Sequence, residues 1–244
     1  MSATSPARRG AGPVLLAIAA IAVALAAGAG IGLGVSRLVE HDDHKTSSPA
    51  GRQAASVLHA GRYTSRRFTP VRYFTIGQGW RVDVDTPALL EISRGGTPFG
   101  SIGFDLPREL LDDGSISYAE AASAGAKVRP VPDDVGAFFR SRPEFETSAS
   151  TPTTVDGQPA DSFTVRLKPL PPENRHLCGA TRCIFYARNA SQLFGLFEND
   201  TTEFTVVRVR NQTVLIAAAA PTQAFDEFRT IANQIVRTVR LRLR

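Results

Sequence analysis

The pattern of hydrophobic and polar positions divides the chain into an apolar run, a polar stretch and a longer region of alternating pattern. No charged residue occurs over Gly12–Val35, and Val14–Val35 is built almost wholly from Ala, Val, Leu, Ile and Gly. At about 1.5 Å per residue this run makes a helix about 33 Å long, which is enough to cross a hydrocarbon core of about 30 Å. The pattern predicts a single transmembrane helix over residues 12–36 (Gly12 to Ser36), with residues 1–11 as a cytoplasmic tail.

A cleaved signal peptide is the alternative to a retained membrane anchor. Arg8 and Arg9 form a basic segment ahead of the run, and the small residues near Ala26–Gly30 suit a signal peptidase. The run is longer than the apolar core of a typical signal peptide, which favours retention. Spaced glycines would also let two such helices approach closely, although Ala-rich composition explains them equally well; they are Gly28, Gly30, Gly32 and Gly34.

The flanking charges and the two cysteines bear on which side of the membrane the domain lies. Two arginines precede the run, and one arginine and one lysine follow it, so charge counting barely decides the orientation. A short tail ahead of a first hydrophobic helix is the usual signal-anchor arrangement, which predicts an extracytoplasmic domain at the plasma membrane. Cys178 and Cys183 are close enough in sequence for a local disulfide, which such a compartment permits. Two reduced thiols are the alternative.

Beyond the run, a polar stretch leads into a region with strand periodicity. Residues 37–62 lack hydrophobic periodicity and predict a flexible linker, so the domain is expected over residues 63–244. Alternation of apolar and polar residues over Trp80–Asp85 predicts a strand with one buried face. Shorter runs of the same kind predict strands at 88–93, 99–105, 145–150, 153–155, 162–167, 184–187, 193–197, 204–210 and 213–219.

Helical periodicity is clearest near the C-terminus. Apolar residues recur at three- and four-residue spacing from Phe225 to Val239, which predicts an amphipathic helix with Thr222 as its cap. A shorter helix is expected over residues 133–142. The region 106–132 shows neither the strand period nor the helix period, apart from a short helix expected near Tyr118. We therefore expect a loop or lid there. The fold class is therefore α+β, with an antiparallel sheet flanked by helices.

Composition and motifs exclude several classes of function. The net charge is +5 and Arg greatly outnumbers Lys, a bias typical of a GC-rich bacterial genome, so we expect no nucleic acid partner. His176 lacks a neighbouring nucleophile motif, and neither a P-loop nor a Gly-x-Ser-x-Gly elbow occurs. Solvation explains the strand and turn carboxylates, so we expect no catalytic residue, no metal site and no cofactor. These carboxylates are Asp83, Asp85, Asp105, Asp112 and Asp113.

Two places remain that core burial does not explain. Arg240, Arg242 and Arg244 alternate with apolar residues in an expected closing strand, so they could line one face and contact an anionic surface. The region 106–132 is the other candidate, because loops on a rigid sheet often carry recognition. We expect an interaction or ligand-binding module whose partner is an envelope protein or a small ligand. A structural role in envelope assembly is the alternative, followed by an enzyme.

The order of short motifs also resembles a known group of proteins. Gly79-Trp80 lies in an early strand, Arg142-Pro143 ends a short helix, and Thr154–Ala160 turns into a strand ahead of the C-terminal helix. Over residues 63–244 the chain resembles actinobacterial membrane-anchored envelope proteins with a PsbP/Mog1-like α/β sandwich. The resemblance implies a sheet flanked by helices and relatives that are mostly non-catalytic. This sequence lacks the lipobox cysteine of lipid-anchored relatives.

Overall fold

The computed structural model describes residues 56–113, 118–169, 176–178, 181–189 and 192–242 of the chain. They belong to one compact unit, Ile31–Arg244. The expected cytoplasmic tail, transmembrane helix and most of the linker lie outside the described residues. Within the described ranges, no helix is long and apolar enough to cross a membrane.

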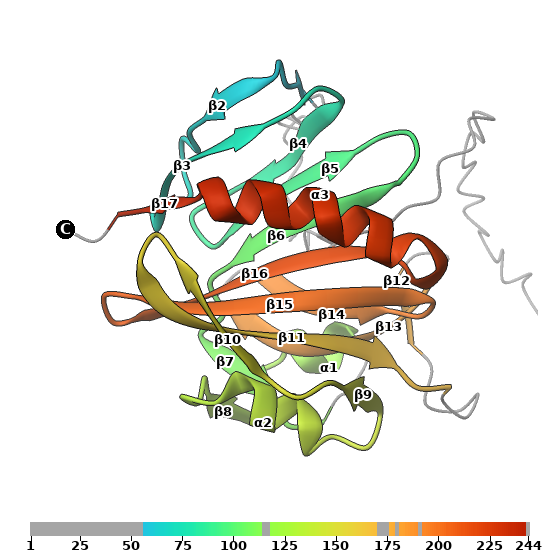
Figure 1. Ribbon diagram of the computed structural model, residues 1–244. Helices are drawn as coiled ribbons and strands as arrows, with labels where there is room; N and C mark the ends of the chain where they lie inside the picture. Colours follow the sequence, from blue (N-terminus) through green and yellow to red (C-terminus); the bar gives the residue numbers. More distant parts are fainter. Residues whose placement is uncertain (1–55, 114–117, 170–175, 179–180, 190–191, 243–244) are drawn as a thin grey trace, which may run out of the picture. The chain divides into compact units, whose positions relative to one another are not determined.

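A large antiparallel sheet forms the middle of the described unit (Figure 1), and its strand order is β1-β4-β5-β6-β16-β15-β11-β10, with β9 beside β11. Most neighbours along this order are joined by short turns, so residues close in sequence pair directly. The strands are β1 (Ser56–Val57), β4 (Trp80–Asp85), β5 (Leu89–Arg94), β6 (Gly100–Asp105), β9 (Phe145–Thr147), β10 (Thr151–Val155), β11 (Gln158–Leu167), β15 (Asp200–Val209) and β16 (Gln212–Pro221).

Two smaller sheets and the helices complete the described part of the chain. One sheet has the order β12-β13-β7-β8, with β14 beside β13, and the other has the order β17-β3-β2. Their strands are β2 (Gly61–Tyr63), β3 (Val71–Ile76), β7 (Glu109–Leu111), β8 (Val128–Pro130), β12 (His176–Cys178), β13 (Thr181–Asn189), β14 (Gln192–Phe197) and β17 (Arg240–Leu241). The helices are α1 (Tyr118–Ala122), α2 (Val135–Arg140), the 3-10 turn η2 (Thr222–Ala224) and α3 (Phe225–Thr238).

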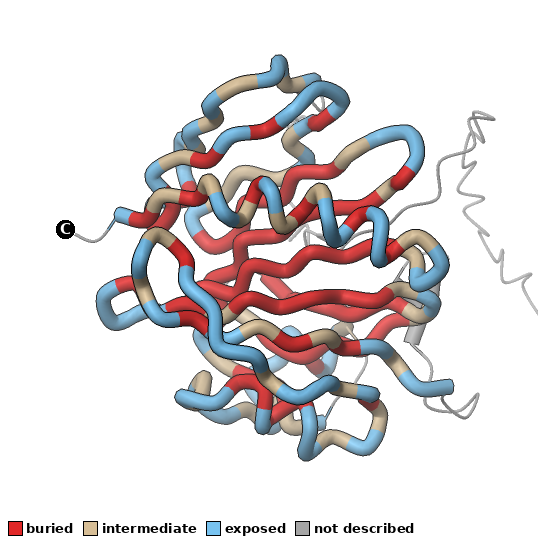
Figure 2. The backbone as a smooth tube through the Cα atoms, viewed as in Figure 1, coloured by how far each residue is buried: buried red, intermediate tan, exposed pale blue. Residues whose placement is uncertain are grey.

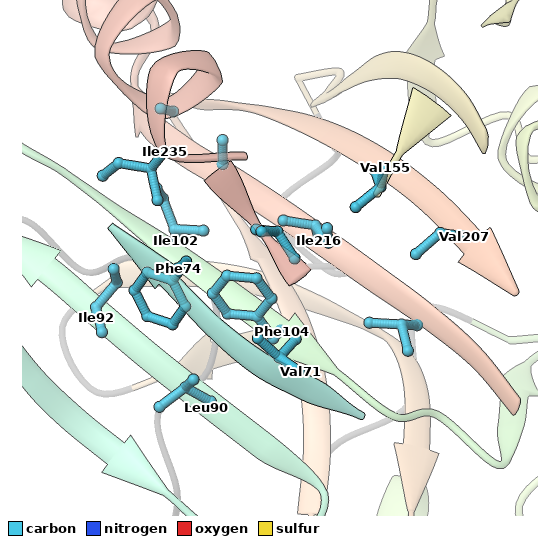
Figure 3. Close-up of a cluster of buried hydrophobic side chains, with 14 of the residues drawn as sticks. Val71, Phe74, Leu90, Ile92, Ile102, Phe104, Val155, Val207, Ile216 and Ile235 are labelled. Atoms are coloured by element: carbon cyan, nitrogen blue, oxygen red, sulfur yellow. The ribbon is translucent and has the colours of Figure 1, made fainter. Parts of the chain in front are cut away.

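Both faces of the large sheet are covered, since all residues of β6 and residues Val214–Ala220 of β16 are buried (Figure 2). On one face, Ile102 and Phe104 of β6 pack with Phe74 of β3 and Ile235 of α3 (Figure 3). On the other face, an aromatic cluster centred on Phe139 of α2 joins the large sheet to β13 and β14. The expected α+β class, with antiparallel sheets and a C-terminal helix, is therefore confirmed.

The region 106–132 is more regular than the sequence predicts. It contains β7, α1 and β8, and β7 pairs with both β8 and β13. Each of these two strands has three residues, which is too short for a period to show in the sequence. The described strands also begin ahead of the expected boundary at residue 63, since β1 pairs with β4 in the large sheet and β2 starts at Gly61 in the β17-β3-β2 sheet.

The C-terminal helix is confirmed, but its expected cap is wrong. Thr222 lies in η2, where its Oγ1 donates a hydrogen bond to the carbonyl of Asn199 at 2.9 Å. The helix α3 begins three residues later at Phe225, and Ala224 precedes it without a side-chain cap. Asp226 and Glu227 in the first turn supply the negative charge that the helix dipole favours there.

Candidate functional site

The three C-terminal arginines do not form a continuous exposed row in the described residues. Arg240 lies in β17 with its Nε 3.4 Å from Asp156 Oδ1, so its charge is already paired. Arg242 is exposed, follows the end of β17 and donates its backbone N–H to the carbonyl of Pro70 at 2.9 Å. Arg244 lies outside the described residues. An anionic contact by all three therefore stays a prediction, and the structure gives Arg240 a partner within the domain.

The two cysteines lie on paired strands. Cys178 in β12 is opposite Thr181 in the antiparallel register, and Cys183 in β13 is opposite His176. Cys183 is buried, and the described residues include no free cysteine. The local disulfide stays a prediction, because strand register alone does not establish a covalent bond.

The carboxylates of the sequence have different environments. Asp85 Oδ1 accepts a hydrogen bond from Ser65 Oγ at 2.6 Å, and Asp85 Oδ2 accepts one from the backbone N–H of Arg66 at 3.1 Å. Asp85 therefore fixes the turn before β3. The expectation of solvation is wrong for Asp105, which is 0% exposed and accepts a hydrogen bond from Tyr186 Oη at 2.9 Å. Burial raises the pKa of Asp105 to about 7.

A second buried carboxylate lies on the strand next to Asp105. Glu91 of β5 is buried, and burial together with the charges of Asp83 and Asp105 raises its pKa well above the ordinary value. Asp105 Oδ1 has no hydrogen-bond partner among the described residues. The side chains of Glu91 and Asp105 are both buried, and neither lines the two hollows described below. Within the described ranges, no group of three His, Cys, Asp or Glu residues could hold a metal ion.

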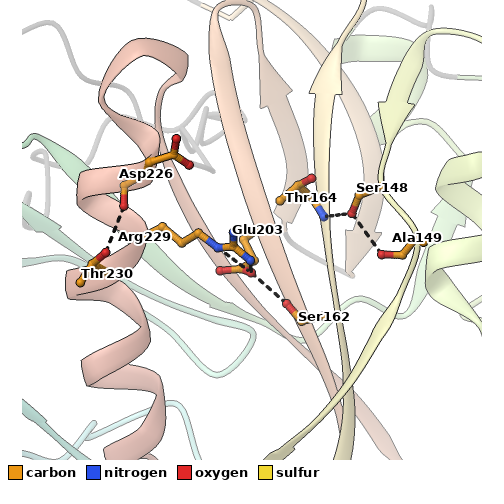
Figure 4. Close-up of polar contacts among 8 residues, drawn as sticks. All are labelled: Ser148, Ala149, Ser162, Thr164, Glu203, Asp226, Arg229 and Thr230. Carbon is orange, nitrogen blue, oxygen red and sulfur yellow. Dashed lines mark hydrogen bonds and ion pairs between the residues drawn. The ribbon is translucent and has the colours of Figure 1, made fainter.

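A polar groove, here called the α3 groove, runs between α3 and the β10–β11 hairpin, with β11 and β15 as its floor (Figure 4). Its cavity volume is about 270 Å³. The helix contributes a row of side chains at four-residue spacing, Arg229, Asn233 and Arg237. The strands and the segment before β10 contribute mainly hydroxyl groups, from Ser148, Thr151, Thr153, Thr154, Ser162, Thr164 and Thr205.

Glu203 of β15 is the fixed charge of the α3 groove. Its side chain is 5% exposed, and its Oε1 accepts three hydrogen bonds. Arg229 donates two of them, from Nη2 at 2.6 Å and from Nε at 3.0 Å, and Ser162 Oγ donates the third at 3.1 Å. The hydrogen bonds to Glu203 also raise the pKa of Arg229. The carboxylate is therefore held in one position without any ligand.

A second and larger hollow, here called the proline hollow, has a volume of about 670 Å³. Both ends of the region 106–132 line it, together with the turn between β15 and β16. Three prolines restrict its walls, Pro87, Pro107 and Pro130. Its polar groups come from Thr69, Arg108, Asn189, Arg208, Asn211, Gln212 and Thr213.

Backbone contacts fix the walls of the proline hollow. The N–H of Leu106 donates to the carbonyl of Ala88 at 2.9 Å, and Asn189 Nδ2 donates to the carbonyl of Leu106. Arg208 pairs with Asp133 across one rim. The hollow is thus formed before any ligand binds, and Arg108 is exposed at its edge.

Comparison with known proteins shows a likeness to solved structures and to no family or curated protein. No protein-family model and no curated protein matches the chain. The chain is similar to the solution structure of cyanobacterial PsbP (CyanoP) from Synechocystis sp. PCC 6803, with a TM-score of 0.39 and 10% sequence identity. The likeness covers 80% of this chain and 99% of that chain. It concerns the course of the backbone and not an activity.

Proposed function

We propose that this chain is a membrane-anchored, extracytoplasmic binding module that takes up a small ligand or a short segment of an envelope protein in the proline hollow. The observation that carries the proposal is the hollow itself. Its volume of about 670 Å³ lies within the range of about 300 to 1,000 Å³ typical of ligand sites.

The composition of the proline hollow supports binding. Its amide side chains offer both hydrogen-bond donors and acceptors, and the Arg108 guanidinium offers donors only. Because prolines and backbone hydrogen bonds already fix the walls, a ligand loses little affinity to ordering the site. The region 106–132, expected to carry recognition, supplies five of its lining residues: Leu106, Pro107, Arg108, Pro130 and Val131.

A structural role in envelope assembly has less support in the surface of the domain. A permanent protein interface usually includes a contiguous exposed apolar patch. Among the described residues, Val57 alone is an exposed large hydrophobic side chain, at 75%. A soluble ligand or a polar peptide segment therefore fits the described surface better than a broad apolar partner.

The membrane topology of the proposal has its own test. The run over residues 12–36 is expected to remain as an anchor, with the domain outside. Protease added to intact cells should then remove the domain, whereas complete protection would contradict the orientation. A soluble mature form released from the membrane would contradict retention. Thiol labelling of denatured, non-reduced protein should find both cysteines blocked by the expected disulfide.

Site-specific photo-crosslinking tests the hollow as the ligand site. A photoreactive amino acid would replace Gln212, which lines the proline hollow, in the full chain in its native membrane. Gln234 is the matched control, because it is also an exposed glutamine but lines neither hollow. We expect a discrete adduct from position 212 that is absent from position 234. The same adducts at both positions, or at neither, would contradict the proposal.

A further inference from the structure

The α3 groove differs from an ordinary solvated surface, because its polar groups converge from four elements. Arg229, Asn233 and Arg237 come from α3, whereas the hydroxyl groups come from β10, β11, β15 and the segment before β10. Figure 4 shows Glu203 and Arg229 meeting between the helix and the strands. The groove shares no lining residue with the proline hollow, so the two are separate sites.

The charges of the groove leave one cation uncompensated. Glu203 and Arg229 form an ion pair and neutralise one another. Arg237 is exposed two helical turns further along, and no ion pair joins it to any other residue of the described ranges. The groove therefore has a net positive charge at the end nearest Arg237. A guanidinium in this position favours a carboxylate or a phosphate.

The fixed carboxylate offers a further contact. All three hydrogen bonds to Glu203 reach Oε1, and no donor within the described residues reaches Oε2. A carboxylate oxygen accepts hydrogen bonds only, so its natural partner in a ligand is a hydroxyl or an N–H group. The hydroxyl groups of the floor both donate and accept, which matches a ligand that carries several hydroxyl groups of its own.

The size and composition of the groove limit the ligand further. A volume of about 270 Å³ lies just below the range typical of drug-sized ligands, so one sugar-sized unit fits best. The one aromatic residue among the lining, Phe163, is buried and offers no exposed ring for stacking. Hydrogen bonds and charge must therefore supply the affinity.

We infer that the α3 groove binds a polyol that carries one anionic group. Arg237 contacts the anion, Glu203 Oε2 and Asn233 contact hydroxyl groups of the ligand, and the threonine-rich floor supports the ring or chain between them. Two sources have this chemistry: a free sugar acid, and a glycerol phosphate unit of a lipid headgroup or an envelope polymer.

Isothermal titration of the full chain in neutral detergent micelles tests the inference with defined probes. The probes are glucuronate and glycerol phosphate, with glucose as the neutral polyol and acetate as the anion without hydroxyl groups. We expect at least one of the first two to bind about tenfold more tightly than both controls, because hydrogen bonds to charged groups are the stronger ones. Equal binding of glucose, or no binding by either anionic polyol, would overturn the inference.

Variants locate the site and separate the two sources. Arg237→Gln should lower the affinity for the anionic polyol about tenfold, whereas Arg72→Gln, at an exposed arginine that lines neither hollow, should leave it unchanged. If Arg237→Gln lowers the melting temperature, Asn233→Ala is the second groove variant in which the affinity for the anionic polyol is measured. Phosphatidylglycerol vesicles that compete with bound glycerol phosphate would assign the headgroup, whereas glucuronate binding without such competition would assign the sugar acid. Unchanged binding in both groove variants would refute the α3 groove as the site.

Discussion

The helix α3 lies over one face of the large sheet, and the two halves of that face differ. Beside β6 and β16 the facing side chains are apolar, such as Ile102, Phe104 and Ile216, and they form a closed core. Over Ser162 of β11 and Glu203 and Thr205 of β15 they are polar, and the α3 groove remains open. The same helix and the same sheet therefore make a core on one side and a hollow on the other.

The difference follows from the residues that α3 turns to each side. Phe228, Ala232 and Ile235 form its apolar stripe and are buried against the core. Arg229 and Asn233, one position further on, lie about 100° around the helix and line the groove. A helix with one apolar stripe can close only one half of a sheet face. Polar residues opposite its other side thus indicate a place for a ligand.

The largest effect is expected on the closed half. Phe228 is fully buried, packs 6.2 Å from the Trp80 ring centre, and lies where a methyl group on Gly100 would meet its ring at 2.5 Å. Phe228→Ala should reduce the free energy of unfolding by about 3 to 5 kcal/mol, as measured by urea denaturation. Asn233→Ala on the open half should change it by at most about 0.5 kcal/mol. Similar losses in both variants would contradict the difference between the halves.

Asp105 is a buried carboxylate beneath the opposite face of the large sheet, so its titration should affect the stability of the fold and not ligand binding. It therefore sharpens the comparison between the closed core and the open groove. The pKa of Asp105 is raised to about 7 by burial, so the unfolded chain loses this proton at lower pH than the folded chain does. Stability should therefore fall as pH rises from about 4 to about 7, on the order of 3 kcal/mol in total, and then level off.

Asp105→Asn tests this pH dependence. Because the amide does not titrate, the variant should lose the part of the slope that Asp105 contributes in urea denaturation measured between pH 4 and pH 7. Glu91 also has a raised pKa and remains in the variant, so a slope of the same sign should persist. Tyr186 should keep its hydrogen bond to position 105. An unchanged slope would show that Asp105 is ionised in the folded protein.

A smaller effect is expected for the ion pair of the groove. Arg229→Ala removes two of the three hydrogen bonds to Glu203, whose carboxylate is almost fully buried. We expect a loss of about 1 to 3 kcal/mol in the free energy of unfolding, because a buried charge is left with one donor, Ser162. The control is Arg208→Ala, whose partner Asp133 is 95% exposed, and it should cost at most about 1 kcal/mol.

Sequence pattern predicts the regular elements of this fold and only part of its hollows. The strand over 80–85 and the helix starting at Phe225 follow from periodicity, because burial of one face selects alternate or every third and fourth residue. The predicted cap at Thr222 is wrong, because Thr222 instead bonds to Asn199, 23 residues away in sequence. Local pattern does not show such a contact.

The two hollows were open to prediction to different degrees. The proline hollow includes both ends of the region 106–132, where the loss of periodicity gave a signal. The α3 groove gave none, because hydroxyl residues at alternate positions of a strand indicate a solvent-facing side equally well. The groove is recognised only from the contact between Arg229 and Glu203, which lies 26 residues earlier in the chain. Only the packing of α3 brings these residues together.

Backbone amide chemical-shift mapping by NMR tests most directly whether the open half of the α3 face is a ligand site. The full chain, isotope-labelled and in neutral detergent micelles, would be titrated with glucuronate and then with glycerol phosphate. The shifts should change for the residues that line the α3 groove, within 148–154, 162–164, 203–205 and 229–237, and should stay constant around Phe228's apolar neighbours on β6. Changes confined to the proline hollow, or no saturable change anywhere, would contradict the account.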